Sequence, residues 1–270
     1  MRRFGLKAVS SDMEWIDTHS HIYDEQFDED REEALARAKE ASVVSLILPG
    51  IDIESYDRMI TCADSLKGYA FPCIGLHPTS VGENWREELD FVRDHLGDRP
   101  FVAIGEIGLD AYWSKEFIEQ QKRVMAEQLE IASRAGLPVI LHVREATDVL
   151  FEVLEDVKGL ELKGSFHAYS GSYETYKRGL KYGDFKFGIG GVVTYKKAGI
   201  AQDLPRMSMS DIILETDCPW LTPVPHRGHR NESSYIPIIG AQVASLTGLS
   251  IEEVAATTTR NARQLFNLAG

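Results

Sequence analysis

Cysteine is scarce in this chain. Its 270 residues include three cysteines, Cys62, Cys73 and Cys218, and none of them forms a Cys-x-x-Cys motif. An odd number of isolated cysteines predicts neither a disulfide framework nor a zinc knuckle. We interpret Cys62 and Cys73 as small buried residues. Cys218 directly follows Asp217, so it either lines a site or packs in the core.

Long hydrophobic runs are also missing. No apolar stretch approaches the roughly 20 residues that a membrane span needs. The first residues carry Arg2, Arg3 and Lys7 but lack the continuous apolar core of a secretory signal. We therefore expect a cytoplasmic protein that does not associate with membranes. Residues 1–12 precede the first strand-like run, so we expect them to be an N-terminal tail or the product of an upstream start.

Positive charge is in short supply. The chain has 29 Lys and Arg against 42 Asp and Glu, and its formal net charge is −13. A protein that coats nucleic acid neutralises many phosphates with basic side chains, so this balance argues against such a binding mode. It leaves open an enzyme that binds a phosphodiester locally, because divalent metal ions can supply the positive charge instead.

Apolar runs alternate with helical segments along the chain. Glycine-rich Gly-x-Gly-x-x-Gly and P-loop motifs are absent, which weakens the case for an open, doubly wound nucleotide-binding sheet. Runs that are apolar almost throughout are typical of parallel strands covered on both faces. Eight such runs favour an α/β fold, a single-domain (β/α)8 TIM barrel over residues 13–270. The strand-like runs are 13–18, 43–48, 70–75, 101–104, 139–141, 164–166, 185–189 and 212–215, and the helical segments are 28–41, 53–66, 85–96, 115–135, 146–157, 172–182, 234–247 and 251–268.

Metal-ligating residue types follow five of these runs. His19 and His21 end the first run, and side chains at i and i+2 of a strand point to the same side. Such a pair either binds a metal ion or makes ordinary hydrogen bonds. The recurrence favours metal binding, because the carboxyl ends of barrel strands meet at one face. The other ligand-type residues at strand ends are Glu106, His142, His167 and Asp217.

This set of residues is too large for one tetrahedral zinc ion, which takes four ligands. Four histidines and two carboxylates suit two divalent ions that share a bridging carboxylate. Such a pair activates a water molecule and stabilises both the attacking and the leaving oxygen of a phosphoryl transfer. Mixed histidine and carboxylate ligands accept Zn²⁺, Mn²⁺, Fe²⁺ or Co²⁺, whereas Mg²⁺ prefers oxygen. The composition of the set therefore indicates hydrolysis.

Several segments resemble the signature motifs of the TatD family of metal-dependent deoxyribonucleases. They are Asp-Thr-His-Ser-His at 17–21, Gly-Leu-His-Pro at 75–78, Gly-Glu-Ile-Gly-Leu-Asp at 105–110, Leu-Glu-Thr-Asp-Cys-Pro-Trp-Leu-Thr-Pro at 214–223 and Thr-Thr-Arg-Asn-Ala at 258–262. The resemblance covers Met13 to the C-terminus. This chain departs from many members at Thr79, where they have a second histidine, and in the segment from Arg230 to Ser233, where they have Arg-Asn-Glu-Pro.

The resemblance implies a hydrolase of the amidohydrolase type with two divalent metal ions, Zn²⁺, Mg²⁺ or Mn²⁺. By this resemblance His19, His21 and Asp217 hold one ion, His142 and His167 hold the other, and Glu106 bridges both. Asp217 is also the natural proton acceptor for the attacking water. The implied activity is cleavage of DNA phosphodiester bonds, with 3′-to-5′ exonuclease action on single-stranded or frayed ends.

Candidate substrate contacts have structural alternatives of similar weight. His77 either contacts a phosphate or caps a turn, and Arg144 either clamps a phosphate or forms a surface salt bridge. Tyr112, beside Trp113, either stacks on a base or covers the core. Arg227 and Arg230 lie in a basic loop that either contacts a polyanion or is simply solvated. Asp110 and Glu215 are expected to support metal-bound residues rather than to bind metal themselves.

Three functions remain open on the residues alone. In the first, DNA is the substrate and no obligate protein partner is expected. In the second, the same metal site cleaves a small amide, ester or lactone, since the activated water attacks a carbonyl as readily as a phosphorus. In the third, the protein is a catalytically silent scaffold, which a complete ligand set makes the least favoured.

Overall fold

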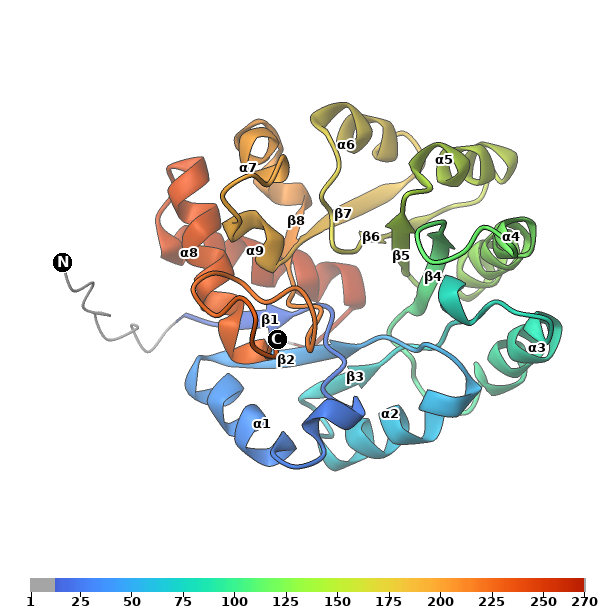
Figure 1. Ribbon diagram of the computed structural model, residues 1–270, viewed down its shortest axis with the longest axis horizontal. Coiled ribbons are helices and arrows are strands. Elements are labelled where there is room, and N and C mark those ends of the chain that lie inside the picture. The colour runs from blue at the N-terminus through green and yellow to red at the C-terminus, as the bar shows by residue number, and fades with distance from the viewer. Residues whose placement is uncertain (1–12, 270) are drawn as a thin grey trace.

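The computed structural model describes residues 13–269, so the expected tail at 1–12 lies outside the described residues. Within the described part, eight parallel strands follow one another in chain order. They are β1 (Trp15–Asp17), β2 (Val43–Leu48), β3 (Ala70–Pro72), β4 (Ile104–Asp110), β5 (Val139–Arg144), β6 (Lys163–Phe166), β7 (Asp184–Ile189) and β8 (Ile212–Leu214). Helices surround the strands (Figure 1).

The strands form a ring through two ladders and two weaker seams. Strands β1, β2 and β3 pair in that order in one sheet, and strands β4 to β8 pair in chain order in a second sheet. At one seam Ile74 pairs with Ile104 in an isolated parallel bridge, and at the other Ser20 pairs with Cys218. The amide of Thr18 also donates to the carbonyl of Leu214 across the second seam, at 3.1 Å. The expected TIM barrel is thus confirmed, with single bridges in place of ladders at the two seams.

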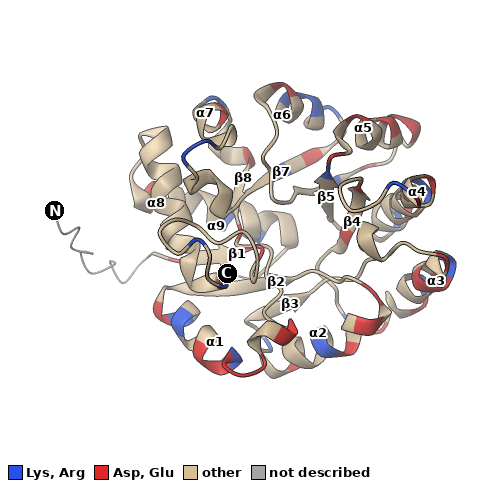
Figure 2. Ribbon diagram, in the orientation of Figure 1, with Lys and Arg blue, Asp and Glu red and all other residues tan. Residues whose placement is uncertain are grey.

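The described helices largely match the helical segments that the sequence predicts. Acidic and basic residues both occur along these helices (Figure 2). Between β7 and β8, however, the sequence analysis missed α7, because four residues are too few to show helical periodicity. The sequence also predicts an early interruption of the helical segment 234–247 at Pro237, and this is wrong. The proline lies in the first turn of α8, where its missing N–H costs no hydrogen bond. The helices are α1 (Arg31–Glu40), α2 (Ile53–Ser65), α3 (Trp85–His95), α4 (Ile118–Ala135), α5 (Thr147–Asp156), α6 (Tyr173–Gly179), α7 (Ile200–Asp203), α8 (Ile236–Thr247) and α9 (Ile251–Phe266).

No single helix among residues 13–269 has the length and apolar character of a membrane span. The segments Ser233–Thr247 and Ile251–Phe266 reach that threshold only as a pair, and the chain bends by 113° between them.

Helix α9 closes the amino-terminal end of the barrel. Its Leu265 and Phe266 belong to a buried cluster with residues from inside the barrel, among them Ile16 of β1. The Thr259 hydroxyl donates to the carbonyl of Glu14 at 2.7 Å, and the Asn261 side-chain amide donates to that of Ile212, also at 2.7 Å. The motif at 258–262 therefore anchors the starts of β1 and β8, and the opposite end of the barrel stays open.

The fourth strand differs from the sequence expectation. The apolar run predicted a strand over 101–104 with Glu106 after it, but β4 runs from Ile104 to Asp110, so Glu106 lies inside the strand. Gly105 and Gly108 hid this strand, because they interrupt the apolar pattern. Both are needed for close packing: a Cβ on Gly108, whose φ is +143°, would lie 2.0 Å from the carbonyl oxygen of His142.

Replacing Gly108 should therefore destabilise the barrel far more than replacing a glycine in open space. We expect Gly108→Ala to lower the free energy of unfolding by about 3 kcal/mol or more, since the methyl group meets backbone atoms. Gly136→Ala is the matched control, because Gly136 also has positive φ, +66°, but nothing lies within 4 Å of its added Cβ. The control should lose about 1 kcal/mol. Urea denaturation measures both values, and equal losses would contradict the packing argument.

Candidate metal centre

A single carboxylate lies at the centre of the open end of the barrel. Glu106 is 2% exposed, and its two oxygens face different histidines. Oε2 lies 3.1 Å from His19 Nε2 and 3.8 Å from His21 Nε2. Oε1 lies 2.8 Å from His142 Nδ1 and 3.3 Å from His167 Nε2. Glu106 therefore separates two groups of imidazoles and touches both.

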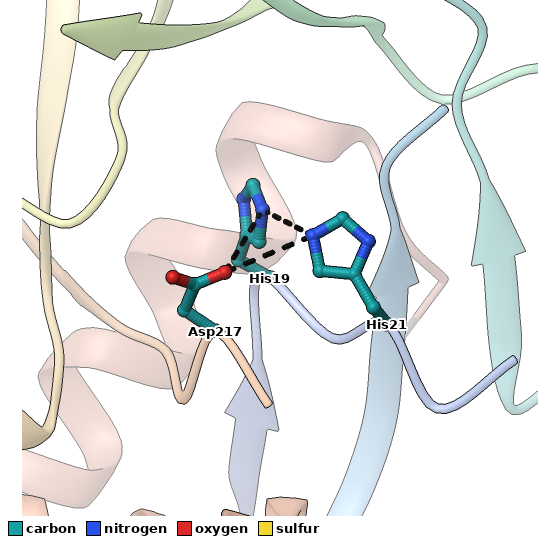
Figure 3. A group of neighbouring side chains, drawn as sticks. All are labelled: His19, His21 and Asp217. Atoms are coloured by element: carbon teal, nitrogen blue, oxygen red, sulfur yellow. Dashed lines mark hydrogen bonds and ion pairs between the residues drawn. The ribbon is translucent and has the colours of Figure 1, made fainter. Parts of the chain in front are cut away.

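The first group contains a second carboxylate. Asp217 Oδ1 lies 3.7 Å from Nε2 of both His19 and His21, and these two nitrogens are 3.1 Å apart (Figure 3). Two neutral imidazole nitrogens this close cannot both donate to each other, so at least one directs a lone pair inward. The two Nε2 atoms and Asp217 Oδ1 thus converge on one point, as the ligand atoms of a metal ion do.

Backbone contacts between the loops after β1 and β8 create this convergence. The amide of Asp217 donates to the carbonyl of His19, and the amide of His21 donates to that of Cys218, each at 2.9 Å. Asp217 takes a positive φ of +56°, which is uncommon for a residue with a side chain and recurs at functional sites. The chain therefore holds its carboxylate against the two histidines at a local conformational cost.

Outer hydrogen bonds orient the inner nitrogens of the histidines. His21 Nδ1 lies 2.9 Å from the Tyr23 hydroxyl, which itself donates to the carbonyl of Pro49, so the ring N–H is the donor. His142 Nε2 donates to Asp110 Oδ2 at 3.0 Å. His167 Nδ1 donates to Glu215 Oε1 at 3.1 Å. In His21 and His167 the outward N–H leaves a lone pair on the inner nitrogen, the arrangement that metal-bound histidines adopt. His142 also donates from its inner nitrogen, Nδ1, to Glu106 Oε1 at 2.8 Å, so it would have to lose that proton to bind a metal ion.

Asp110 and Glu215 thus make the supporting contacts expected of them, whereas the sequence analysis missed Tyr23. Its position two residues after His21, on the same chain segment, was the available signal. Glu215 also needs space: a Cβ on Gly188 would lie 1.9 Å from its Oε2, so the glycine of β7 makes room for this carboxylate.

The protonation states suit metal binding. Burial lowers the pKa of His19, His21 and His167, which keeps them neutral. Burial raises the pKa of Glu106, but the surrounding histidines, led by His167, outweigh it and hold that pKa well below its usual range. Neutral imidazoles around an ionised carboxylate are what a divalent ion requires.

Two groups show where positive charge is favoured. Burial lowers the pKa of His142, but the hydrogen bonds to Asp110 and Glu106 outweigh it and raise the pKa to about 9. Burial also raises the pKa of Asp217 to about 7. Both shifts favour a proton at the site, on His142 between two carboxylates and on the buried Asp217. A divalent ion can replace these protons as the source of positive charge, so the residues present fit divalent ions. The groups whose donor atoms all lie within 4.8 Å of one another are His19, His21 and Asp217; His19, Glu106 and His167; and His77, Glu106 and His142.

A pocket of about 610 Å³ lies above the metal ligands and is lined by several of the predicted residues. Arg144 and His77 both line it, and so do two exposed tryptophans, Trp113 (71% exposed) and Trp220 (44% exposed). Trp220 was missed as a site residue although it lies three residues after Asp217, and its ring packs edge-on against His21 with centroids 5.1 Å apart. The pocket thus joins a polar floor to an aromatic rim.

Arg144 has no ion-pair partner among residues 13–269. Its guanidinium instead lies 3.6 Å from the centroid of the Tyr112 ring and 5.4 Å from that of Trp113. Tyr112 is not among the lining residues of the 610 Å³ pocket, but with Arg144 it lines a neighbouring pocket of about 390 Å³. Arg144 and Tyr112 therefore form a wall between the two pockets, and the guanidinium places a positive charge there.

The two arginines of the basic loop lie away from the lining of both pockets. Arg230 makes two contacts of 2.7 Å to the carboxylate oxygens of Asp30 and stacks over Phe27, so its charge is paired and it anchors the loop to the segment before α1. Arg227 is exposed and lies over the ring of Tyr195 at 4.4 Å.

Fold and site together define a barrel hydrolase that depends on metal ions. A family model described as TatD related DNase matches residues 16–267, and the chain belongs to this family. It is 35% identical to YabD of Bacillus subtilis strain 168, described as an uncharacterized metal-dependent hydrolase, over 254 residues that are 94% of this chain and 99% of the relative.

Two further relatives carry more detail. The chain is 33% identical over 250 residues to a 3′-5′ ssDNA/RNA exonuclease TatD of Erwinia tasmaniensis, covering 90% of this chain and 96% of that protein. The crystal structure of YjjV, a TatD homologue from Escherichia coli K12, superposes with a TM-score of 0.87 at 30% identity and covers 94% of this chain and 98% of the other.

Removing an outer acceptor should weaken metal binding without removing a ligand. Asp110→Asn keeps the oxygen that accepts from the Tyr112 amide but turns an N–H group toward His142 Nε2, so that two donors meet. We expect metal affinity to fall by about 10- to 100-fold. Isothermal titration of metal-stripped protein with Mn²⁺ measures the change.

Asp211→Asn is the matched control, because Asp211 likewise accepts from an aromatic side chain, the Tyr176 hydroxyl, but outside the metal site. Its Mn²⁺ affinity should equal that of the unaltered protein. If Asp110→Asn bound Mn²⁺ with the same affinity as the unaltered protein, Asp110 would not orient His142.

Proposed function

We propose that this protein is a metal-dependent deoxyribonuclease that hydrolyses phosphodiester bonds from the 3′ end of single-stranded or frayed DNA. The observation that carries the proposal is the carboxylate of Glu106 between two histidine groups, beneath a pocket lined by Arg144, which has no ion-pair partner among the described residues. The name of the Erwinia relative, a 3′-5′ ssDNA/RNA exonuclease, supports both the substrate class and the direction.

In this proposal two divalent ions, Zn²⁺, Mg²⁺ or Mn²⁺, bind on the two sides of Glu106. His19, His21 and Asp217 hold one ion, and His142 and His167 hold the other. When bound, such ions activate a water molecule as nucleophile and neutralise charge on phosphate oxygens. Asp217 directs Oδ1 toward the histidines, which leaves Oδ2 to accept the proton of the attacking water (Figure 3).

The pocket walls favour a nucleic acid substrate. The Arg144 guanidinium can form two parallel hydrogen bonds to phosphate oxygens, and Tyr112 holds it in place by stacking. Trp113 and Trp220 offer exposed aromatic faces on which unpaired bases stack without regard to sequence. Arg227, which is exposed, adds positive charge on the loop after β8, and Arg230 anchors that loop.

The depth of the metal ligands in the pocket supports the proposed preference for the ends of DNA strands. Glu106 and the histidines around it are buried at the base of the pocket, whereas the aromatic residues stand at its rim. A single-stranded end can enter such a site, but an intact duplex cannot bring its backbone to the base without separating its strands. The volume of about 610 Å³ also suits a small amide, ester or lactone, which is the second candidate.

Digestion of end-labelled single-stranded DNA tests the first candidate. Metal-stripped protein is refilled with Mg²⁺, Mn²⁺ or Zn²⁺, and Glu106→Gln is run in parallel. We expect a ladder that shortens from the 3′ end and depends on metal, and a loss of at least about 10³-fold in rate for the variant, because the amide replaces the shared charge. Metal-loaded protein that leaves DNA intact but hydrolyses a neutral ester would favour the second candidate.

Arg144 separates the two candidates in one protein. Arg144→Gln should lower kcat/KM for single-stranded DNA by about 10- to 100-fold, since a charge-assisted contact to phosphate is lost. Hydrolysis of p-nitrophenyl acetate, which carries no phosphate, should not change. Arg206→Gln is the matched control, because Arg206 also stacks on a tyrosine, Tyr173, at 4.0 Å, outside the metal site. Equal losses on both substrates would contradict a phosphate contact.

A further inference from the structure

His77 is the one histidine at the site whose role the metal ligands do not explain. It follows β3 and begins the short helical turn Pro78–Ser80, and its side chain is 13% exposed at the wall of the 610 Å³ pocket. Its Nε2 lies 3.4 Å from Glu106 Oε1 and 3.4 Å from His142 Nδ1. By proximity alone His77 could complete a ligand set with Glu106 and His142.

The hydrogen bond at the other ring nitrogen decides against this. His77 Nδ1 accepts from the backbone amide of Thr79 at 3.1 Å, where the side chain caps the turn. A backbone N–H can only donate, so Nδ1 carries the lone pair and the ring proton is on Nε2. The nitrogen that faces the site is therefore a donor and has no lone pair to offer a metal ion.

This arrangement is the reverse of that in the neighbouring histidines. His21 and His167 each direct an N–H outward, to Tyr23 and Glu215, and so keep a lone pair inward. His142 likewise directs its Nε2–H outward, to Asp110. His77 accepts outward and donates inward. One histidine in the same cluster thus offers a different chemical group to whatever binds in the pocket.

Among residues 13–269, the inward N–H of His77 also lacks an acceptor at ordinary hydrogen-bond distance. Glu106 Oε1, at 3.4 Å, lies beyond the usual range of about 2.7–3.2 Å for such a bond. His142 Nδ1 is also 3.4 Å away, but it donates to Glu106 Oε1 at 2.8 Å and cannot accept. Those same atoms, Glu106 Oε1 and His142 Nδ1, are the ones directed toward a metal ion. With an ion bound there, the N–H is free for an oxygen of a bound ligand.

We propose that His77 is not a metal ligand but the hydrogen-bond donor that holds a phosphoryl oxygen of the substrate beside the metal ions. The assignment rests on the proposed function, because it takes a phosphate ester as the ligand. Thr79 acts as a positioning residue through its backbone amide. Its hydroxyl oxygen also lies close to His77 Nδ1, at 2.6 Å. Thr79→Ala keeps the amide and should therefore keep the donor in place.

Two binding measurements on the metal-loaded protein test the assignment without turnover. The first counts Mn²⁺ ions per chain by elemental analysis after desalting, for the unaltered protein, His77→Phe and His142→Phe. The second titrates each with thymidine 5′-monophosphate, with inorganic phosphate, and with thymidine as the probe that lacks phosphate. Thermal unfolding of each variant verifies that it folds, and His77→Gln is a second variant that retains a side-chain N–H.

We expect His77→Phe to hold as many Mn²⁺ ions as the unaltered protein, while His142→Phe loses one. Affinity for thymidine 5′-monophosphate should fall by about 10- to 100-fold in His77→Phe, the usual effect of a lost hydrogen bond to a charged group. His77→Gln should restore part of that loss, Thr79→Ala should cause little loss, and thymidine binding should not change.

A missing Mn²⁺ ion in His77→Phe would overturn the assignment and make His77 a ligand. Unchanged affinity for both phosphate probes would overturn it equally. Failure of the proposed nuclease activity would look different. If phosphate binding depended on His77 but the protein cut no DNA, His77 would still be the hydrogen-bond donor, and only the proposed function would be wrong.

Discussion

The buried carboxylate of Glu106 is the constraint on which the rest of the site depends. An ionised carboxylate away from water is costly unless positive charge or hydrogen bonds compensate for it. Here four histidines, one in β5 and the others shortly after β1, β3 and β6, lie within 3.4 Å of its oxygens. The pKa of His142 is raised to about 9, but burial lowers the pKa of the other three histidines and keeps them neutral. The histidines therefore supply only part of that compensation, and the arrangement is most stable when metal cations occupy the space between carboxylate and histidines.

The barrel satisfies this constraint by bringing strand ends together. The loops after β1 and β8 exchange backbone hydrogen bonds, which bring Asp217 next to His19 and His21. Glycines in β4 and β7 allow the backbones and the Glu215 carboxylate to pack closely. Outer acceptors then set which nitrogen of each histidine faces inward, so that positions and tautomers are both fixed before any ligand binds.

Much of this was predictable from the sequence, because barrel strands end at one face and ligand-type residues lie at or just after the ends of five strand-like runs. Glu106 was identified although its strand was misplaced, since the glycines that hid β4 left the motif intact. The structure was needed to show which way each side chain points and which partner it contacts. Sequence spacing cannot show that Arg230 pairs with Asp30, 200 residues away, or that the Arg144 guanidinium stacks on Tyr112. Tautomers were equally out of reach, because they depend on partners such as the Thr79 amide.

Diffraction from crystals grown with Mn²⁺, recorded at a wavelength where manganese scatters anomalously, tests the central role of Glu106 most directly. Two anomalous peaks should appear, one beside each oxygen of Glu106, with His19, His21 and Asp217 around the first and His142 and His167 around the second. His77 Nε2 should contact neither. A single peak, or two peaks that Glu106 does not bridge, would contradict the assignment of this carboxylate as the shared ligand.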